Sequence, residues 1–223
     1  MINKKWIINS YKNDISWIDA YTDNYIIYDK TGELPETDKI KHQKNVGYSC
    51  YDFCCFIIDN YDNLPDVCVF IKASVFNRVP PHCNKEKFDK LIQNNSFTPL
   101  ESYENIPEFG WHKKDIDGGY MELNNSWYIG SHVQTHGPEV VKYFYNYNDF
   151  MNEMFVDYEA PEWLRFAPGG NYIVPKANIL FYTKLFWTKI KFYQGYCQLP
   201  SEAHLIERAL YYIFTNRWSE KMT

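Results

Sequence analysis

The sequence lacks the short motifs that mark several common nucleotide-dependent and hydrolytic enzymes. It contains no G-x-x-x-x-G-K-[ST] phosphate loop, no G-x-G-x-x-G dinucleotide fingerprint and no G-x-S-x-G nucleophile elbow. Each motif uses glycines to bring the backbone close to a phosphate or to hold a nucleophile on a tight strand-to-helix turn. Their absence argues against P-loop kinases, dinucleotide-dependent dehydrogenases and Ser-His-Asp hydrolases.

Cysteines at metal-binding spacing are also missing. The six cysteines include no C-x-x-C pair, and Cys54 and Cys55 are adjacent within an apolar run. This pattern argues against a zinc site and a disulfide framework. It predicts buried free thiols in a reducing compartment.

Long apolar runs and an excess of basic charge are absent as well. No stretch approaches the roughly 20 apolar residues of a membrane-spanning helix, and the apolar run near the start is too short for a signal peptide. A net charge of −5 argues against a partner with a long phosphate backbone, although a local basic pocket can still hold one diphosphate. We therefore expect no membrane segment, no nucleic-acid partner and a cytoplasmic location.

The composition is that of an ordinary globular protein with many aromatic residues. A length of 223 residues and a hydrophobic content of 45% suit a single domain over residues 1–223. Aromatic residues make up 19%, including 20 Tyr. Tyrosine combines a flat apolar face with a polar tip, which suits sugar rings and nucleobases. The alternative explanation is the codon bias of an AT-rich genome.

Apolar runs in the first third of the chain predict three buried strands, over Trp6–Ile8, Tyr25–Tyr28 and Val67–Ile71. Between the last two, apolar residues recur at helical spacing from Asn45 to Tyr61. Strands that alternate with helices form parallel sheets covered on both faces. We therefore expect an α/β fold of the Rossmann-like type, with a central, mostly parallel sheet flanked by helices.

Polar clusters follow all three predicted strands, over Ser10–Asp14, Asp29–Thr31 and Lys72–Ser74. Ligands of open α/β sheets bind beyond the carboxyl ends of the strands, so these clusters are candidates for a binding site. The alternative is that each strand simply ends in a polar turn. On the binding hypothesis, the contributing residues include Ser10, Tyr11, Asn13, Asp29, Lys30, Lys72 and Ser74.

Three parts of the chain together resemble a known family. They are Asn9–Trp17, then Asn45–Gly47 with Ile57–Phe70, and finally Gly169–Pro175 followed by Ile206–Arg208. In this order they look like a family catalogued as a domain of unknown function with a GT-A glycosyltransferase-like core. They are also similar to the amino-terminal glycosyltransferase domain of the chlorella-virus enzyme that builds capsid glycans.

This resemblance implies a GT-A glycosyltransferase domain. The donor would be a UDP-sugar, the cofactor Mn²⁺ or Mg²⁺, and the acceptor a glycan or glycoprotein. The viral likeness further implies viral capsid glycosylation in the host cytoplasm. The transferred sugar would be rhamnose, with glucose as a second sugar that the pocket accepts. It leaves open whether the domain acts alone or within a longer multi-domain enzyme.

The sequence departs from the family pattern at the metal site. GT-A enzymes usually place Asp-x-Asp after the central strand, where it holds a metal on the donor diphosphate, but here Lys72 begins the corresponding tripeptide. The literal Asp-x-Asp of this chain is formed by Asp115 and Asp117. Either these two bind the metal, or Lys72 supplies the positive charge, or the diphosphate and water hold the metal. Arg78 is a further candidate for phosphate contact, with exposed salt bridging as the alternative for both cations.

The nucleoside would lie against the ends of the first strands. Tyr11 can stack on uracil, and Asn13 or Asp29 can hydrogen-bond the base edge or the ribose. Asn45 and Gly47, at a predicted helix start, offer backbone N–H groups to an anion. The alternative for these two is a helix cap with a closely packed glycine.

An acceptor hydroxyl must lose a proton in an inverting enzyme, and the candidate bases are Asp117, His204 and Glu207. His204 and Glu207 lie three residues apart on one predicted helix, so they can act together. Alternatively, Glu207 forms a structural ion pair with Arg208. A retaining enzyme would need no such base, so the stereochemistry stays open.

A Gly-Gly turn is the last candidate element. Gly169 and Gly170 precede Asn171 and a predicted strand, and glycine lets the backbone approach a sugar closely. These three residues are therefore candidate sugar or acceptor contacts.

Two other classes of protein compete with the transferase. A non-catalytic carbohydrate-binding domain would explain the aromatic residues, but such domains are more often all-β. A nucleotidyltransferase on a similar sheet is the second alternative.

Overall fold

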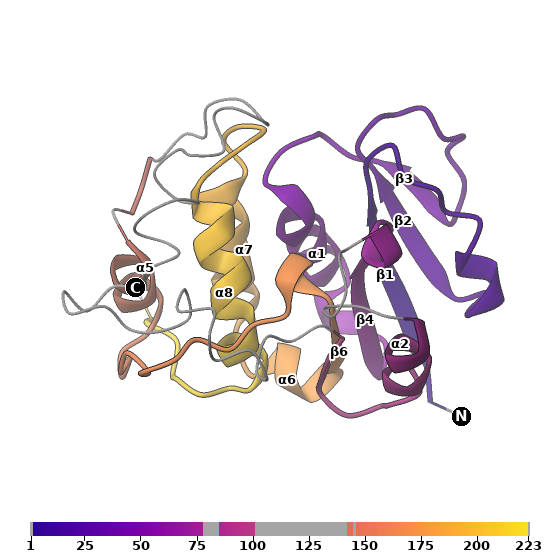
Figure 1. Cartoon of the computed structure of the whole chain (residues 1–223). Helices are drawn as coiled ribbons and strands as arrows, with labels where there is room; N and C mark the ends of the chain where they lie inside the picture. Colours follow the sequence, from indigo (N-terminus) through magenta and orange to yellow (C-terminus); the bar gives the residue numbers. More distant parts are fainter. Residues whose placement is uncertain (1, 78–84, 101–141, 145, 223) are drawn as a thin grey trace.

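The described residues form one six-stranded sheet, which lies beside a group of helices (Figure 1). The computed structural model describes residues 2–77, 85–100, 142–144 and 146–222. The strand order is β3-β2-β1-β4-β6-β5. In chain order the strands are β1 (Lys4–Ser10), β2 (Tyr25–Asp29), β3 (Ile40–His42), β4 (Val67–Lys72), β5 (Thr98–Pro99) and β6 (Tyr172–Pro175).

The sheet is mixed rather than parallel throughout. β1 is parallel to β2 and to β4, and β2 is parallel to β3. β6 is antiparallel to both β4 and β5. The expected α/β fold with a central sheet flanked by helices is confirmed, but a mostly parallel sheet is not, since only β3-β2-β1-β4 are parallel. The chain enters β6 from the turn at Gly169–Asn171, at the carboxyl edge of the parallel strands, so β6 runs in the opposite direction.

Helices cover both faces of the sheet. The larger helices are α1 (Tyr48–Asp59), α2 (Lys85–Leu91), α5 (Tyr147–Met154), α6 (Lys176–Leu180), α7 (Lys184–Gln194) and α8 (Glu202–Phe214). Figure 1 shows α1 between the sheet and the pair α7 and α8. α2 packs on the opposite face, where short 3₁₀ turns such as η1 (Ile18–Ala20) and η3 (Val75–Asn77) also lie. We refer to the two faces as the α1 face and the α2 face.

Alternation of side chains along the strands divides the core into two clusters. Ile7, Tyr28 and Phe70 belong to the cluster on the α1 face, together with α7 and α8. Trp6 and Ile8 belong to the cluster on the α2 face. Because successive strand residues point to opposite faces, a strand that is apolar on both sides must be covered twice. This explains the continuous apolar runs of β1 and β4.

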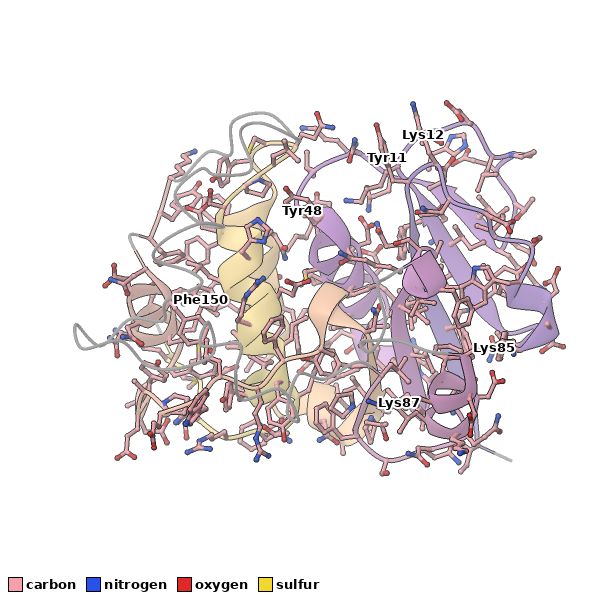
Figure 2. All side chains as sticks on the ribbon, viewed as in Figure 1. Tyr11, Lys12, Tyr48, Lys85, Lys87 and Phe150 are labelled. Carbon is pink, nitrogen blue, oxygen red and sulfur yellow. The ribbon has the colours of Figure 1, made fainter. Side chains whose placement is uncertain are left out.

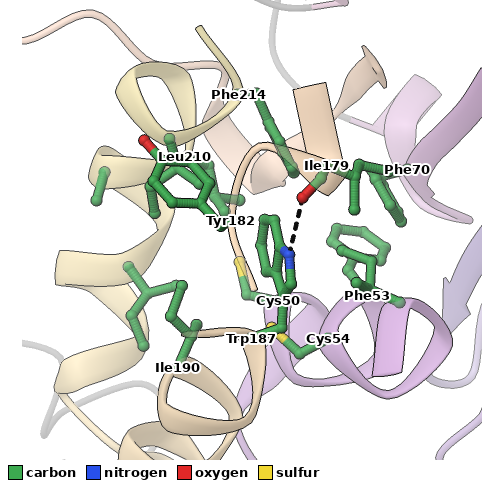
Figure 3. Close-up of a cluster of buried hydrophobic side chains, with 14 of the residues drawn as sticks. Cys50, Phe53, Cys54, Phe70, Ile179, Tyr182, Trp187, Ile190, Leu210 and Phe214 are labelled. Carbon is green, nitrogen blue, oxygen red and sulfur yellow. Dashed lines mark hydrogen bonds between the residues drawn. The ribbon is translucent and has the colours of Figure 1, made fainter. Parts of the chain in front are cut away.

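The α1-face cluster is centred on a fully buried tryptophan (Figure 3). Trp187 donates a hydrogen bond from Nε1 to the carbonyl of Ile179 at 3.1 Å, so its polar group is satisfied. Its ring stacks near Phe214 with centroids 5.8 Å apart. An aromatic side chain of this kind contributes about 4–6 kcal/mol through burial, as an upper bound.

The residues between β6 and Gly195 form two helices, α6 and α7, rather than one continuous helix. α6 ends before Tyr182, which turns inward, is fully buried and stacks on Phe186 at 4.2 Å. Thr183 then caps α7 by accepting a hydrogen bond from the Phe186 N–H. The predicted helix that carries His204 and Glu207 is confirmed as α8, which begins at Glu202; the side chain of the preceding Ser201 makes no capping hydrogen bond.

The prediction of buried free thiols is confirmed for four of the five cysteines that the structure describes. Cys50, Cys54, Cys55 and Cys68 are buried free thiols, and Cys197 is a half-buried one. Across the same described ranges, every helix is too short or too polar to cross a bilayer.

Candidate functional site

The carboxyl ends of β1, β2 and β4 meet at one edge of the sheet. Ser10 lies beside Asp29 in the β1–β2 register, and Asn9 lies beside Lys72 in the β1–β4 register. The predicted convergence of the polar clusters is therefore confirmed at the level of the backbone. Figure 2 shows Tyr11 and Lys12 just beyond this edge, on the same side of the molecule as Tyr48 at the start of α1.

The side chains at this edge divide between the two faces. Asn9 and Lys72 share the α1 face with Ile7 and Phe70, because each pair is two residues apart on one strand. Ser10 and Asp29 point to the α2 face and are each 1% exposed. The proposed nucleotide contacts are thus not all presented to a single surface.

The Asp29 side chain forms its hydrogen bonds with the turn that follows it. Its carboxylate accepts hydrogen bonds from the Thr31 N–H and hydroxyl at 2.9 and 2.7 Å, and from the Leu34 N–H at 3.0 Å. Burial alone would raise the pKa of Asp29, but these hydrogen bonds outweigh it and lower the pKa below the usual value. In this conformation Asp29 holds the β2–β3 connection, which favours the polar-turn interpretation for this residue.

Lys30 and Asp52 form a buried ion pair under the edge. Their charged atoms lie 3.4 Å apart, and their side chains are 2% and 0% exposed. The Asn9 amide also donates to Asp52. Burial raises the pKa of Asp52 to about 7, against the opposing effects of Lys30 and Asn9. Burial likewise lowers the pKa of Lys30.

The same lysine fixes the start of α1. Lys30 Nζ donates to the carbonyl oxygens of Val46 at 2.5 Å and Tyr48 at 2.6 Å. Between them the backbone is left-handed, with φ values of 62° at Gly47 and 52° at Tyr48. A non-glycine residue in this region is unfavourable, so the two carbonyl contacts stabilise an otherwise strained turn.

Gly47 packs too closely to be a free anion-binding position. Its N–H donates to the Cys197 carbonyl at 3.3 Å. A Cβ at this position would lie 2.6 Å from the Gln194 carbonyl oxygen and 2.8 Å from Tyr51 Cβ. These contacts favour the close-packing interpretation of Gly47. Asn45 is half-buried just before it.

The Gly169–Asn171 turn is held from three sides. The Glu207 carboxylate accepts the Gly169 N–H, and the Ser49 hydroxyl donates to the Gly169 carbonyl at 3.1 Å. Asn171 Oδ1 accepts the backbone N–H of Lys72 at 2.9 Å. Both glycines have positive φ, 84° and 71°, as the turn requires. The turn therefore joins β4, α1 and α8 at the edge.

Glu207 is also the partner of Arg208. Their charged atoms lie 2.5 Å apart, and the side chains are only 15% and 5% exposed. The guanidinium of Arg208 packs over the Phe166 ring at 4.6 Å. The predicted structural ion pair is therefore present, and Glu207 positions the turn in this conformation.

Lys72 is the last residue of β4, and its backbone N–H donates to Asn171 of this turn. It is half-buried, and within the described ranges its ammonium group has neither a hydrogen bond nor an ion pair. The charges of Glu207 and Lys72 both act on the Cys50 thiol, whose pKa is raised to about 12, chiefly by burial. Lys72, Glu207 and the first turn of α1 are therefore neighbours, as the binding hypothesis requires.

The remaining candidates lie around the rim. Tyr11 is 46% exposed, and its N–H donates to the Asn13 side chain at 3.2 Å. Ser74 is half-buried beyond the end of β4. The half-buried His204 lies beside Tyr48, with ring centroids 5.5 Å apart. α8 thus carries its histidine to the beginning of α1.

Three predicted residues, Arg78, Asp115 and Asp117, lie outside the described residues. Among the residues that are described, no three His, Cys, Asp or Glu side chains come together as a metal site. The edge also contains a residue pair that the sequence analysis missed, Asn9 and Asp52. The available signal was Asp52, a carboxylate within the otherwise apolar run Cys50–Ile58 of α1.

The comparisons with known proteins identify a family. A family model described as "Protein of unknown function (DUF3431)" matches residues 7–221. No curated protein and no solved structure matches the chain significantly. The match supports the resemblance to a family of unknown function and carries no assignment to glycosyltransferases or to a viral capsid enzyme. With nearly its whole length matched, the chain belongs to the DUF3431 family.

Proposed function

We propose that the protein is a GT-A type glycosyltransferase that uses a UDP-sugar donor. The observation that supports this most directly is Lys72, which lies at the carboxyl edge next to the start of α1 and the Gly169–Asn171 turn. Its side chain is half-buried, and its ammonium group is unpaired among the described residues. A diphosphate leaving group gains negative charge as the sugar departs. A fixed cation at that position would stabilise it.

The other residues of the edge take roles around that contact. The exposed ring of Tyr11 is available to stack on uracil. The Gly169–Asn171 turn would approach the sugar, with Glu207 as its positioning residue. His204 would accept the proton of the acceptor hydroxyl in an inverting reaction. The proposed transfer product is a glycan or glycoprotein bearing rhamnose or glucose.

Mn²⁺ or Mg²⁺ would supply additional positive charge on the diphosphate when bound. Asp115 and Asp117 are the proposed ligands. The test is the double variant Asp115→Ala/Asp117→Ala, with UDP binding measured with and without Mn²⁺. Mn²⁺-linked binding that survives in this variant would remove both residues from the proposal.

Thermal melting with UDP, GDP and CMP tests the nucleotide specificity. A ligand at about 100 times its Kd stabilises the folded state by about 2.7 kcal/mol, which corresponds to roughly 5–10 °C for a chain of this size. We expect this shift with UDP and a smaller shift with GDP and CMP. Slow hydrolysis of a UDP-sugar would then separate a transferase from a binding domain.

Lys72→Met tests the central contact. Loss of a charge-assisted hydrogen bond worth about 1.5–3 kcal/mol should weaken UDP binding roughly 10- to 100-fold. Lys5→Met is the matched control, because Lys5 is a half-buried lysine near the opposite end of β1, beside Cys68. Equal UDP affinity in the two variants would refute the role of Lys72.

A non-catalytic carbohydrate-binding domain is the competing function. It predicts binding of glycans with no shift from UDP and no hydrolysis of UDP-sugars. These outcomes would replace the transferase proposal.

A further inference from the structure

A groove on the α2 face lies beside the carboxyl edge but is separate from the Lys72 site. Its volume is about 470 Å³. Trp17, Ala20, Tyr21 and Phe76 form an aromatic and apolar wall, and Lys85, Asp89 and Gln93 form a polar wall. Figure 2 shows Lys85 at the beginning of α2.

The aromatic wall is held rigidly. Its three half-buried rings rest on the fully buried Phe88, with centroid distances of 6.4 Å for Trp17, 5.4 Å for Tyr21 and 4.9 Å for Phe76. The indole Nε1 of Trp17 donates to the Ala73 carbonyl at 3.1 Å. These contacts fix the rings before any ligand arrives, which reduces the entropy lost on binding.

The polar wall offers both donors and acceptors at zero net charge. Lys85 Nζ donates to Asp89 at 2.8 Å and to the Tyr21 hydroxyl at 2.9 Å. The Tyr21 hydroxyl donates to the other Asp89 oxygen at 2.7 Å. Gln93 adds an exposed amide, which can donate and accept.

We propose that this groove binds a pyranose ring of a neutral glycan. A sugar ring presents an apolar face of C–H groups, which packs on aromatic rings, and adjacent hydroxyls, which pair with the mixed donors and acceptors of the polar wall. A phosphate-bearing ligand would gain little from Lys85, because its charge is already neutralised by the ion pair with Asp89. A purely apolar ligand would cover the exposed Gln93 amide without giving it a hydrogen-bonding partner.

The groove and the Lys72 site lie on opposite faces of one strand end. Ala73, which accepts the Trp17 hydrogen bond, directly follows Lys72 in the chain. Binding in the groove needs no transfer chemistry, so this inference goes beyond the proposed function and does not depend on it. If the transfer reaction holds, a longer acceptor glycan has a second contact here.

Saturation-transfer NMR on the whole chain tests the inference with the methyl glycosides of glucose, galactose, mannose and rhamnose, and with maltotriose. We expect at least one to bind with a Kd near the millimolar range. Gln93→Ala and Lys85→Met should each weaken that binding about 3- to 10-fold, as expected for one lost hydrogen bond. Lys90→Met is the matched control, because Lys90 forms the equivalent ion pair with Glu86 on the same helix.

Three outcomes would overturn the inference: no saturation transfer to any of these sugars, equal affinity in Gln93→Ala, Lys85→Met and the control, or displacement of the bound sugar by UMP. Melting curves of each variant confirm that it is folded. UDP-induced stabilisation that persists in Lys85→Met but is lost in Lys72→Met would show that the two sites are independent. A failure of one proposal would then leave the other in place.

Discussion

Replacing Gly47 with alanine should destabilise the protein more than the same change at an unconfined glycine. The φ of 62° at Gly47 is a conformation that costs an L-residue about 1–2 kcal/mol. The added Cβ would also lie 2.6 Å from the Gln194 carbonyl oxygen and 2.8 Å from Tyr51 Cβ, both of which are on helices and cannot move easily. Overpacking of this kind typically costs about 1–3 kcal/mol. The expected loss in the free energy of unfolding is therefore about 2–5 kcal/mol.

Gly32→Ala isolates the conformational part of this loss. Gly32 has a similar φ of 71°, but a Cβ there would meet only His42 Nδ1 at 3.9 Å. Urea denaturation of both variants measures the difference, which should be at least about 1 kcal/mol, and melting should show a drop of roughly 2–4 °C for each kcal/mol. Equal losses in the two variants would refute the close packing of α1 against α7, and with it the structural interpretation of Gly47.

Two further predictions concern ionisation and thiol reactivity. Burial raises the pKa of Asp52 to about 7, whereas an unfolded aspartate titrates near pH 4. Between about pH 4 and 7, Asp52 is deprotonated in the unfolded chain but still protonated in the folded chain. The free energy of unfolding therefore falls as the pH rises from about 4 to about 7. Asp52→Asn cannot titrate, and urea denaturation from pH 4 to 8 should show the stability of the wild type falling relative to the variant; parallel profiles would contradict the raised pKa. Among the cysteines that the structure describes, Cys197 should react first with a thiol reagent, since burial raises the pKa of Cys50 to about 12 and that of Cys55 to about 11. Peptide mapping by mass spectrometry measures the order of modification, and the buried cysteines should be modified only after unfolding: Cys50, Cys54, Cys55 and Cys68. Early modification of any of these four would contradict their burial.

The position of the strand ends was accessible from the sequence because it depends on local patterns. Apolar runs locate β1, β2 and β4, and parallel strands bring their carboxyl ends to one edge. Lys72 follows the most apolar run, so its place at the edge could be predicted. The Glu207–Arg208 pair was likewise foreseen as the structural alternative, since the two residues are adjacent in the sequence.

The functions of individual side chains at the edge depend on the path of the connecting chain. The Asp29 carboxylate is taken by N–H groups of the following turn, which only the path of that turn reveals. The Lys30–Asp52 pair joins a strand end to a helix, and no local pattern connects the two residues. Tyr182 breaks a continuous helical pattern because stacking on Phe186 and burial outweigh helix propensity.

The direction of β6 depended on tertiary pairing in the same way. An apolar segment such as Tyr172–Val174 is equally compatible with either orientation beside β4. Its antiparallel register is what brings the Gly169–Asn171 turn to the edge. The sequence indicated a strand after a Gly-Gly turn, and the structure shows why that turn reaches Lys72.

The β4–β6 pairing also bears on the order in which the protein can be assembled during synthesis. The first third of the chain contains β1, β2 and β4, so these strands leave the ribosome early. β6, in which Pro175 pairs with Val67 of β4, is translated much later. Strand pairs between residues far apart in the sequence form slowly. Until β6 emerges, the edge of nascent β4 that faces it keeps unpaired backbone N–H and C=O groups. Ribosome-bound chains that stop before residue 172 should therefore be captured by chaperones, and release should coincide with the emergence of β6 and the helices that follow it.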